Sequence, residues 1–314
     1  MRTDDGSCQA RGGSAVGTIG GKLYVLGGEG GYSNCGKGGT FSSAVVFDPE
    51  SNSWSVATNM STPRMNLAAG VVEGKLYAVG GFSSENKSAL SSMEIYDPST
   101  NSWSAGAPMK DARGKHAAGV LNNKLYVMGG TTSFADPISG MVKSVEVYDP
   151  ANGAWAACSN IDSPRYGLAV VAAFNGLLYA LGGNGDISEP GHSSYASAYD
   201  PIADDWQMNA NMPSIREGVG AGVLNGKIYV FGGSLFDGSS WHTTSKVEVY
   251  DPFIDSWSTA PDMGVARWFM GAGQTDERIY VFGGYGTLQG GKNTYLKSVE
   301  AYRNNSQQQQ SVTY

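Results

Sequence analysis

Apolar residues along this chain gather in short runs, and six of these runs end in a pair of glycines. They read LYVLGG, LYAVGG, LYVMGG, LYALGG, IYVFGG and IYVFGG and recur every 49 to 53 residues, with first glycines at Gly27, Gly80, Gly129, Gly182, Gly232 and Gly283. Short apolar runs bounded by turn residues predict β-strands. No segment shows a sustained helical period with helix caps. The pattern therefore predicts an all-β chain built from six copies of one unit.

Three further landmarks recur with the glycine pairs. An arginine lies 16 or 17 residues before each pair, at Arg11, Arg64, Arg113, Arg165, Arg216 and Arg267. An aromatic-Asp-Pro triplet follows each of the first five pairs and begins at Phe47, Tyr96, Tyr148, Tyr199 and Tyr250. A tryptophan comes seven residues after the start of each triplet, at Trp54, Trp103, Trp155, Trp206 and Trp257. The segment after the glycine pair varies in length, which marks it as a loop.

Each unit contains four predicted strands, A to D. Strand A is rich in Gly, Ala and Val, as in residues 66–72 and 115–121, and strand B is the run that ends at the glycine pair. Pairs such as Asn122-Asn123, Asn175-Gly176 and Asn225-Gly226 tolerate positive φ and suit a hairpin turn between A and B. Strand C alternates polar and apolar residues up to the Asp-Pro, where proline ends the ladder, and strand D carries the tryptophan.

Four strands per unit and six units of about 50 residues are typical of a β-propeller with kelch-type blades. From Arg11 to Tyr302 the chain resembles the kelch repeat family, because all four landmarks recur in one order at nearly fixed spacing. The predicted fold is therefore an all-β, six-bladed β-propeller of four-stranded antiparallel kelch blades. Small residues on strand A suit the innermost position, and the paired glycines allow close backbone approach and unusual φ and ψ.

The last unit departs from the pattern. Tyr302 is followed by Arg303-Asn304 instead of Asp-Pro, and Gln309 stands where a tryptophan is expected. Residues 311–314 alternate suitably and are the predicted fourth strand; the alternatives are a fragment of a longer protein or a frayed last blade. Because six units fill nearly all of the 314 residues, we expect residues 1–314 to form a single propeller without a BTB or other second domain.

Composition narrows the choice of partners. The 21 Lys and Arg residues stand against 28 Asp and Glu, a formal net charge of -7, so nucleic acid and anionic membrane are poor partners. No apolar stretch approaches the ~18 residues of a membrane span, and the polar N-terminus shows no secretory signal. The widely spaced Cys8, Cys35 and Cys158 are typical of reduced thiols. We therefore expect a cytoplasmic, monomeric propeller.

The kelch resemblance also indicates a face for ligand binding. The D-to-A and B-to-C connections share one end of the propeller, and the B-to-C loops are long and dissimilar, as a recognition surface requires. Two tryptophans out of step with the repeat map to this face. Kelch propellers of the ubiquitin-ligase-adaptor kind contact substrate peptides just after the blade arginine and just after the glycine pair. Carried onto this chain, the resemblance implies a binding face that includes Glu29, Met65, Phe82, Thr131, Tyr166, Asn184, Glu217, Ser234, Trp241, Trp268 and Tyr285.

The chemistry of this face favours an apolar ligand. The arginine and serine side chains with which some relatives bind acidic peptides are missing after the blade arginines, so we expect an aromatic-anchored protein or peptide. The alternative is that the aromatic residues only cover the propeller rim. The recurring arginines are expected to pack and hydrogen-bond between blades; the alternative is an anion-binding ring.

Two classes of function stay open. The first is a protein-interaction module, which within a longer chain would be the substrate-recognition part of a ubiquitin-ligase adaptor. The second is a sugar-modifying enzyme of the sialic-acid epimerase kind, or a metal-dependent kelch enzyme, that uses the central mouth. His116 occupies a strand position that is apolar in other units, and no ligand spacing around His192 and His242 completes a metal site. We therefore predict no catalytic residue, metal or cofactor, and favour the interaction module.

Overall fold

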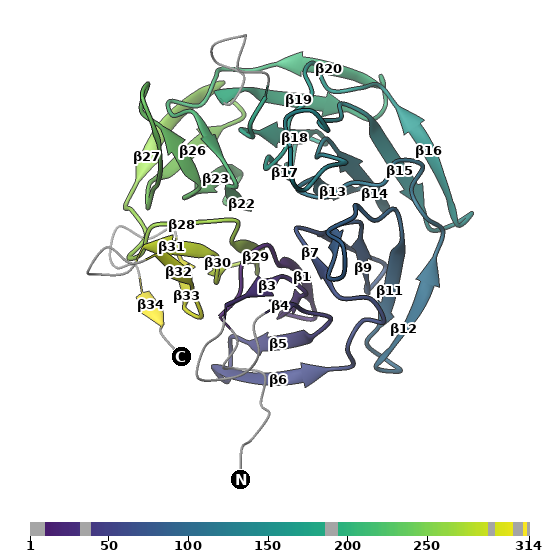
Figure 1. The fold of residues 1–314 in the computed structure, drawn as a ribbon. Helices are drawn as coiled ribbons and strands as arrows, with labels where there is room; N and C mark the ends of the chain where they lie inside the picture. The colour runs from purple at the N-terminus through teal and green to yellow at the C-terminus, as the bar shows by residue number, and fades with distance from the viewer. Residues whose placement is uncertain (1–9, 32–38, 186–193, 288–292, 304–309, 313–314) are drawn as a thin grey trace.

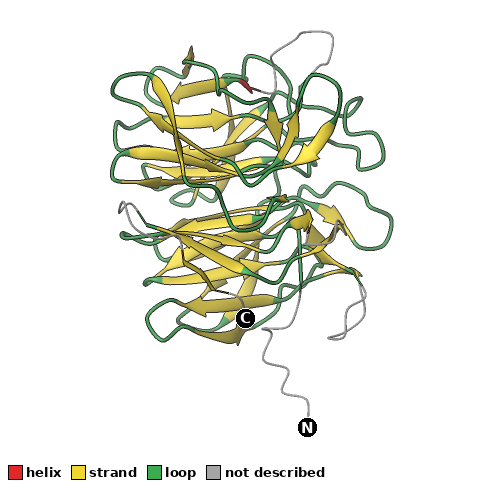
Figure 2. Cartoon of the chain, turned by 90° about the vertical axis from the view of Figure 1, so that its left-hand side faces the viewer, coloured by secondary structure: helices red, strands yellow, loops and turns green. Residues whose placement is uncertain are grey.

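The computed structural model describes residues 10–31, 39–185, 194–287, 293–303 and 310–312. Within these ranges, six four-stranded antiparallel sheets are arranged as blades around a central axis (Figure 1). The side view shows that nearly all regular structure is strand (Figure 2). The predicted all-β propeller of four-stranded antiparallel blades is confirmed.

The blades follow one another in sequence order, and each runs from the axis outward. Blades 1 to 3 consist of β1 (Ala15–Ile19), β2 (Lys22–Leu26), β5 (Ala44–Asp48) and β6 (Ser53–Ala57); β8 (Ala68–Val72), β9 (Lys75–Val79), β11 (Met93–Asp97) and β12 (Ser102–Gly106); and β13 (Ala117–Leu121), β14 (Lys124–Met128), β15 (Val145–Asp149) and β16 (Ala154–Cys158). Blades 4 to 6 consist of β17 (Ala169–Ala172), β18 (Leu178–Leu181), β19 (Ala196–Asp200) and β20 (Asp205–Met208); β22 (Gly220–Leu224), β23 (Lys227–Phe231), β26 (Val247–Asp251) and β27 (Ser256–Ala260); and β29 (Gly271–Gln274), β30 (Ile279–Phe282), β33 (Val299–Tyr302) and β34 (Gln310–Val312).

Four smaller sheets are formed by the D-to-A and B-to-C connections. They are β3 (Glu29–Gly30) with β4 (Gly39–Thr40); β7 (Arg64–Met65) with β10 (Phe82–Ser83); β21 (Arg216–Glu217), β24 (Ser234–Phe236) and β25 (Trp241–Thr243); and β28 (Arg267–Trp268), β31 (Tyr285–Thr287) and β32 (Asn293–Tyr295).

The sixth blade is closed by the C-terminal segment, as the sequence predicts. Strand β34 pairs antiparallel with β33, with Val312 opposite Val299 and Gln310 opposite Ala301. It begins one residue before the predicted strand, whose last two residues, 313–314, lie outside the described residues. Around the axis, β29 of blade 6 contacts β1 of blade 1, so the ring of blades is closed.

The hydrophobic core lies between neighbouring blades. One cluster joins Val79 and Met93 of blade 2 to Leu125 and Tyr148 of blade 3, and a comparable cluster joins blades 6 and 1. Four of the five periodic tryptophans add a hydrogen bond to this packing; Trp103 Nε1 donates to a backbone carbonyl of the preceding blade at 2.6 Å. Trp155, Trp206 and Trp257 do the same. These four tryptophans therefore join neighbouring blades.

Glycine and asparagine occupy the left-handed positions that the sequence predicts. All twelve glycines of the six pairs have positive φ. Both residues of Asn122-Asn123 and of Asn225-Gly226 also have positive φ, as a type I′ hairpin turn requires. The innermost strands begin later than predicted, at Ala68 and Ala117, because Asn66 and Lys115 themselves have φ of 52° and leave the extended conformation.

Candidate functional site

The two predicted sets of contact residues lie opposite each other in every blade. The residue after each blade arginine bridges, antiparallel, to the residue after the glycine pair of the same blade. The six pairs are Gly12–Glu29, Met65–Phe82, Gly114–Thr131, Tyr166–Asn184, Glu217–Ser234 and Trp268–Tyr285. The structure therefore brings ten of the eleven predicted site residues together as short ladders on one face, and Trp241 lies on the same face in β25.

These residues differ in how far their side chains reach the surface. Met65, Phe82 and Thr131 are completely buried, and Tyr166, Asn184, Glu217 and Ser234 are nearly so. Phe82 is buried because its ring packs directly on the backbone of Gly114 in the next blade, where a side chain would collide with it. Met65, Phe82 and Thr131 therefore lie beneath the face in this structure, whereas the sequence places them on it.

Aromatic side chains form an uneven surface over blades 5 and 6. The ring of Trp268 lies 6.3 Å from that of Tyr285 and 5.0 Å from that of Phe269, and Tyr285 in turn contacts Tyr295 at 5.1 Å. Trp241 is 40% exposed and packs against Phe236 at 5.3 Å. Large, rigid aromatic side chains of this kind are enriched among the residues that dominate binding energy at protein interfaces.

A ring of backbone hydrogen bonds surrounds the axis just inside this face. We call its six residues the collar; each lies two positions after a blade arginine, and they are Gly13, Asn66, Lys115, Gly167, Gly218 and Phe269. Each N–H donates to the carbonyl oxygen of the collar residue in the preceding blade, at 2.7 to 2.9 Å, and Gly13 closes the ring by donating to Phe269.

All six collar residues have a left-handed backbone, including the three that are not glycine. The φ angles are 52° at Asn66, 52° at Lys115 and 47° at Phe269. For residues with a side chain, the left-handed conformation costs about 1–2 kcal/mol, with asparagine the more tolerant exception. Strain of this kind persists where the surrounding structure imposes it and often marks a functional site.

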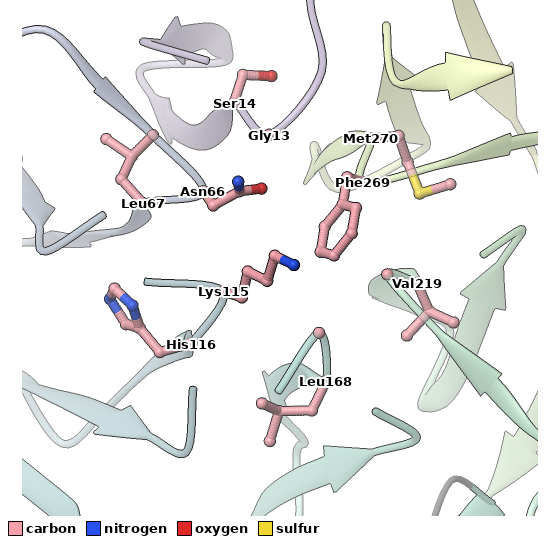
Figure 3. Close-up of a pocket in the computed structure, with 12 residues that line it drawn as sticks. Gly13, Ser14, Asn66, Leu67, Lys115, His116, Leu168, Val219, Phe269 and Met270 are labelled. Atoms are coloured by element: carbon pink, nitrogen blue, oxygen red, sulfur yellow. The ribbon is translucent and has the colours of Figure 1, made fainter. Parts of the chain in front are cut away.

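The collar encloses a small pocket at the end of the axial channel. The pocket has a volume of about 100 Å³ and is lined by the collar residues and the residues that follow them. In the close-up, the side chains of Lys115 and Phe269 point into this opening, with Asn66 beside them (Figure 3). Beyond the collar, a larger channel of about 430 Å³ is lined by the small residues of the innermost strands.

Two ionisable side chains lie at the collar. Burial lowers the pKa of Lys115, and attraction to Glu217 and Glu29 opposes the shift. Burial raises the pKa of Glu217, while interactions with Asn184, Lys115 and Tyr166 oppose that shift. Burial therefore disfavours the charged form of each side chain, and the neighbouring groups favour it.

The six blade arginines do not form an anion-binding ring. Their side chains are buried, and each donates from Nη1 to the carbonyl oxygen of the first glycine of the pair in its own blade, as Arg216 does to Gly232 at 2.8 Å. Four of them also pair with a buried glutamate of strand C, for example Arg113 with Glu146 at 2.7 Å. The predicted packing role is right, but these side-chain bonds lie within a blade, and only the arginine backbone carbonyl joins two blades.

Metal ligands do not cluster in the part of the chain that the structure describes. No group of three or more His, Cys, Asp or Glu side chains there could hold a metal ion. His116 is buried in the strand position predicted for packing, and burial lowers its pKa to about 3. Cys158 is a free thiol; His192, Cys8 and Cys35 lie outside the described residues. None of the described residues belongs to a helix long and apolar enough to cross a membrane.

Comparisons with known proteins agree with this architecture. The family described as KLHDC2/KLHL20/DRC7 Kelch-repeats domain matches residues 13–233, and the Kelch motif matches residues 215–264 and 267–303. Kelch-like protein 35 of Mus musculus is 31% identical over 143 residues, which cover 46% of this chain and 23% of that protein. Kelch-like ECH-associated protein 1B of Danio rerio is 36% identical over 91 residues, covering 29% of this chain and 15% of that protein. The match thus spans less than a quarter of either relative's length.

Among solved structures, YjhT has the same fold. It superposes with a TM-score of 0.76 at 17% sequence identity, covering 96% of this chain and 97% of that chain. At this identity the likeness concerns the fold alone.

Proposed function

The chain belongs to the kelch-repeat family, and on that premise we propose that it is a protein-interaction module whose ligand, a protein or peptide, binds the face of the D-to-A and B-to-C connections. The observation that carries the proposal is the aromatic surface of Trp241, Trp268 and Tyr285 beside the collar pocket. Glu29, Tyr166, Asn184, Glu217 and Ser234 would supply polar contacts around it. Met65, Phe82 and Thr131 would support this face from below, because they are buried.

Two features support a protein ligand. The side chains of Trp241, which is exposed, and of Trp268 and Tyr285, which are partly buried, lie on one face of a scaffold whose ladders are fixed by backbone hydrogen bonds, so little ordering is needed on binding. One relative carries the name Kelch-like ECH-associated protein 1B, which describes an association with ECH. Because the curated relatives extend well beyond the matched region, we also propose that the propeller works within a longer chain as the substrate-recognition part of a ubiquitin-ligase adaptor.

The net charge and the free Cys158 support a cytoplasmic, monomeric propeller.

Affinity capture with variant propellers tests the binding face. The double variant Trp268→Ala with Tyr285→Ala is expected to lose at least about tenfold in affinity for each captured partner, since truncated aromatic anchors cost this much or more. The control is Phe253→Ala with Ile254→Ala, because these apolar side chains are even more exposed than Trp268 and Tyr285 but lie in the strand C-to-D turn of blade 5, on the opposite face. If the control variant lost partners that the Trp268 and Tyr285 variant retained, the ligand would bind the opposite face and the proposal would be wrong.

A further inference from the structure

Lys115 is unlike the other collar residues in what it adds to the pocket. Gly13, Gly167 and Gly218 fill the same position in other blades without a side chain and meet the left-handed backbone without strain. Asn66 and Phe269 add a neutral side chain each. Lys115 alone among the six carries a charge into the opening, and it does so from a backbone conformation that disfavours it (Figure 3).

The Lys115 ammonium lies among aromatic rings. Nζ is 5.0 Å from the ring centre of Tyr166, 5.4 Å from that of Phe269 and 5.9 Å from that of Phe134. Cation–π contacts partly replace hydration but use none of the three N–H donors directionally. In the part of the chain that the structure describes, Lys115 has neither an ion pair nor a side-chain hydrogen bond. Its donors are available to a ligand in the pocket.

Glu217 offers the complementary group. It lies beside Tyr166 and Asn184, and its Cβ is so close to the collar that a side chain on Gly167 would contact it. The side chain is more than nine-tenths buried, and Oε2 has no hydrogen-bond partner among the described residues. Lys115 and Glu217 attract one another electrostatically, yet they do not form an ion pair. Glu217 does not line the pocket itself but directly precedes Gly218, which does. An unused acceptor therefore lies next to the opening into which the unused donor points, and the two do not satisfy each other.

We propose that the collar pocket binds a carboxamide group of a peptide ligand, such as an Asn or Gln side chain, whose carbonyl oxygen accepts from Lys115 Nζ and whose N–H donates to Glu217 Oε2. This inference rests on the proposed interaction function and specifies which chemical group of the ligand enters the collar pocket. Its volume of about 100 Å³ equals roughly three water molecules at ~30 Å³ each, which suits a small planar polar group. Phe269 and Tyr166 would cover the two sides of that group.

A carboxylate fits this site less well than an amide. It would gain the contact with Lys115 but would lie beside the carboxylate of Glu217, and like charges brought together out of water repel. The nearby Glu29, which is paired with Lys87 at 3.6 Å, is also acidic and gives a second carboxylate nothing to pair with. An amide presents an acceptor and a donor at once and leaves the charge of the pocket unchanged.

Selection from a random linear-peptide library displayed against the folded propeller tests the assignment. Peptides that are enriched are then synthesised, and their affinities are measured for the wild type, Lys115→Met and Glu217→Gln. Lys115→Gly is the second lysine variant, because the backbone at this position suits glycine, as at Gly167. Lys75→Met is the control: Lys75 is paired with Asp97 on the opposite face at 3.1 Å. Thermal melting of each variant confirms that it is folded.

The amide assignment predicts a specific pattern. Enriched peptides should contain Asn or Gln, and both Lys115 variants should weaken binding at least about tenfold, as loss of a charged hydrogen bond does. Glu217→Gln should weaken it severalfold, whereas Lys75→Met should leave it within about twofold. A peptide in which Gln is replaced by Glu should bind the wild type more weakly than the original peptide does. The Glu217→Gln variant should recover part of this lost affinity, because the two changes are coupled.

Three results would overturn the assignment. Equal binding to the wild type and to both Lys115 variants would place the peptide elsewhere and leave the proposed interaction function standing. Tighter binding to Glu217→Gln would identify a carboxylate ligand instead of an amide. Failure to enrich any peptide would remove the carboxamide site, while the capture experiment with Trp268 and Tyr285 would still decide the broader function.

Discussion

Replacing Glu248 by Gln tests whether the buried arginine–glutamate pairs hold each blade together. Arg216 is fully buried, and its Nη2 lies 2.6 Å from Glu248 Oε2, while Ser214 Oγ donates to Glu248 Oε1 at 2.5 Å. Glutamine keeps the shape and can still accept one hydrogen bond, but it leaves the guanidinium without a counter-charge. Removing one partner of a buried pair costs about 3–5 kcal/mol. Because Gln retains a hydrogen bond, we expect the lower value, about 3 kcal/mol.

Thermal unfolding followed by circular dichroism measures this cost. An unfolding entropy of about 2.1 cal/mol/K per residue gives about 0.66 kcal/mol/K for a chain of 314 residues, so about 3 kcal/mol corresponds to a loss of about 4–5 °C in Tm. The control is Asp251→Asn in the same blade, which removes the surface Lys227–Asp251 pair at 3.0 Å and should lower Tm clearly less, because solvent screens this pair. Equal shifts in Tm for the two variants would refute the reasoning, because burial would then make no difference.

Further predictions concern pH, blade closure and tryptophan. The folded-state pKa of His116, about 3, lies below the ordinary 6.5, so the unfolded chain takes up a proton first as pH falls. The free energy of unfolding should therefore drop by about 1.4 kcal/mol per pH unit between about pH 6 and 3. His116→Leu should remove this part of the dependence of Tm on pH. Gly232→Ala should lower Tm by several degrees, since a Cβ there collides with the carbonyl of Arg267, whereas Gly176→Ala faces open space and should cost only about 1 kcal/mol; similar melting curves would contradict this. Trp103→Phe, which loses the hydrogen bond between blades 1 and 2, should lower the free energy of unfolding in urea by about 1 kcal/mol or more, and an unchanged midpoint would count against that bond.

The blade architecture could be predicted from the sequence because its determinants are local and repeated. Strand lengths, turn residues and glycine pairs lie within about 50 residues and recur in one order, so each copy supports the reading of the others. The same period places Trp268 and Tyr285 on one face, and the structure adds that their backbones pair in β28 and β31. Sequence reasoning missed the glutamate of strand C, such as Glu248, because it resembles an exposed polar residue of an alternating strand. Its recurrence in four blades was the available signal, and in the structure it pairs with the blade arginine.

The collar could not be predicted, because hydrogen bonds between residues about 50 positions apart impose it. Nothing in the local sequence of Lys115 or Phe269 favours a left-handed backbone, and the conformation follows from the bonds to the neighbouring blades. Burial of Phe82 has a similar origin: the residue after the glycine pair meets the residue after the arginine of the next blade, and that residue, Gly114, leaves room for the ring. Repeat spacing gives the position of a residue in its blade, but not its neighbour across the gap.

The collar's hydrogen bonds have neither a first donor nor a last acceptor. A helix leaves unpaired N–H groups at one end and carbonyl oxygens at the other, and these ends attract ions of opposite sign. Here six peptide groups run head to tail in a circle, so their dipoles circulate around the axis and no end is left over. The backbone groups of the collar are therefore already hydrogen-bonded to one another and offer a ligand little. The selectivity of this opening depends on a few side chains, which can change while the ring of backbone hydrogen bonds stays intact.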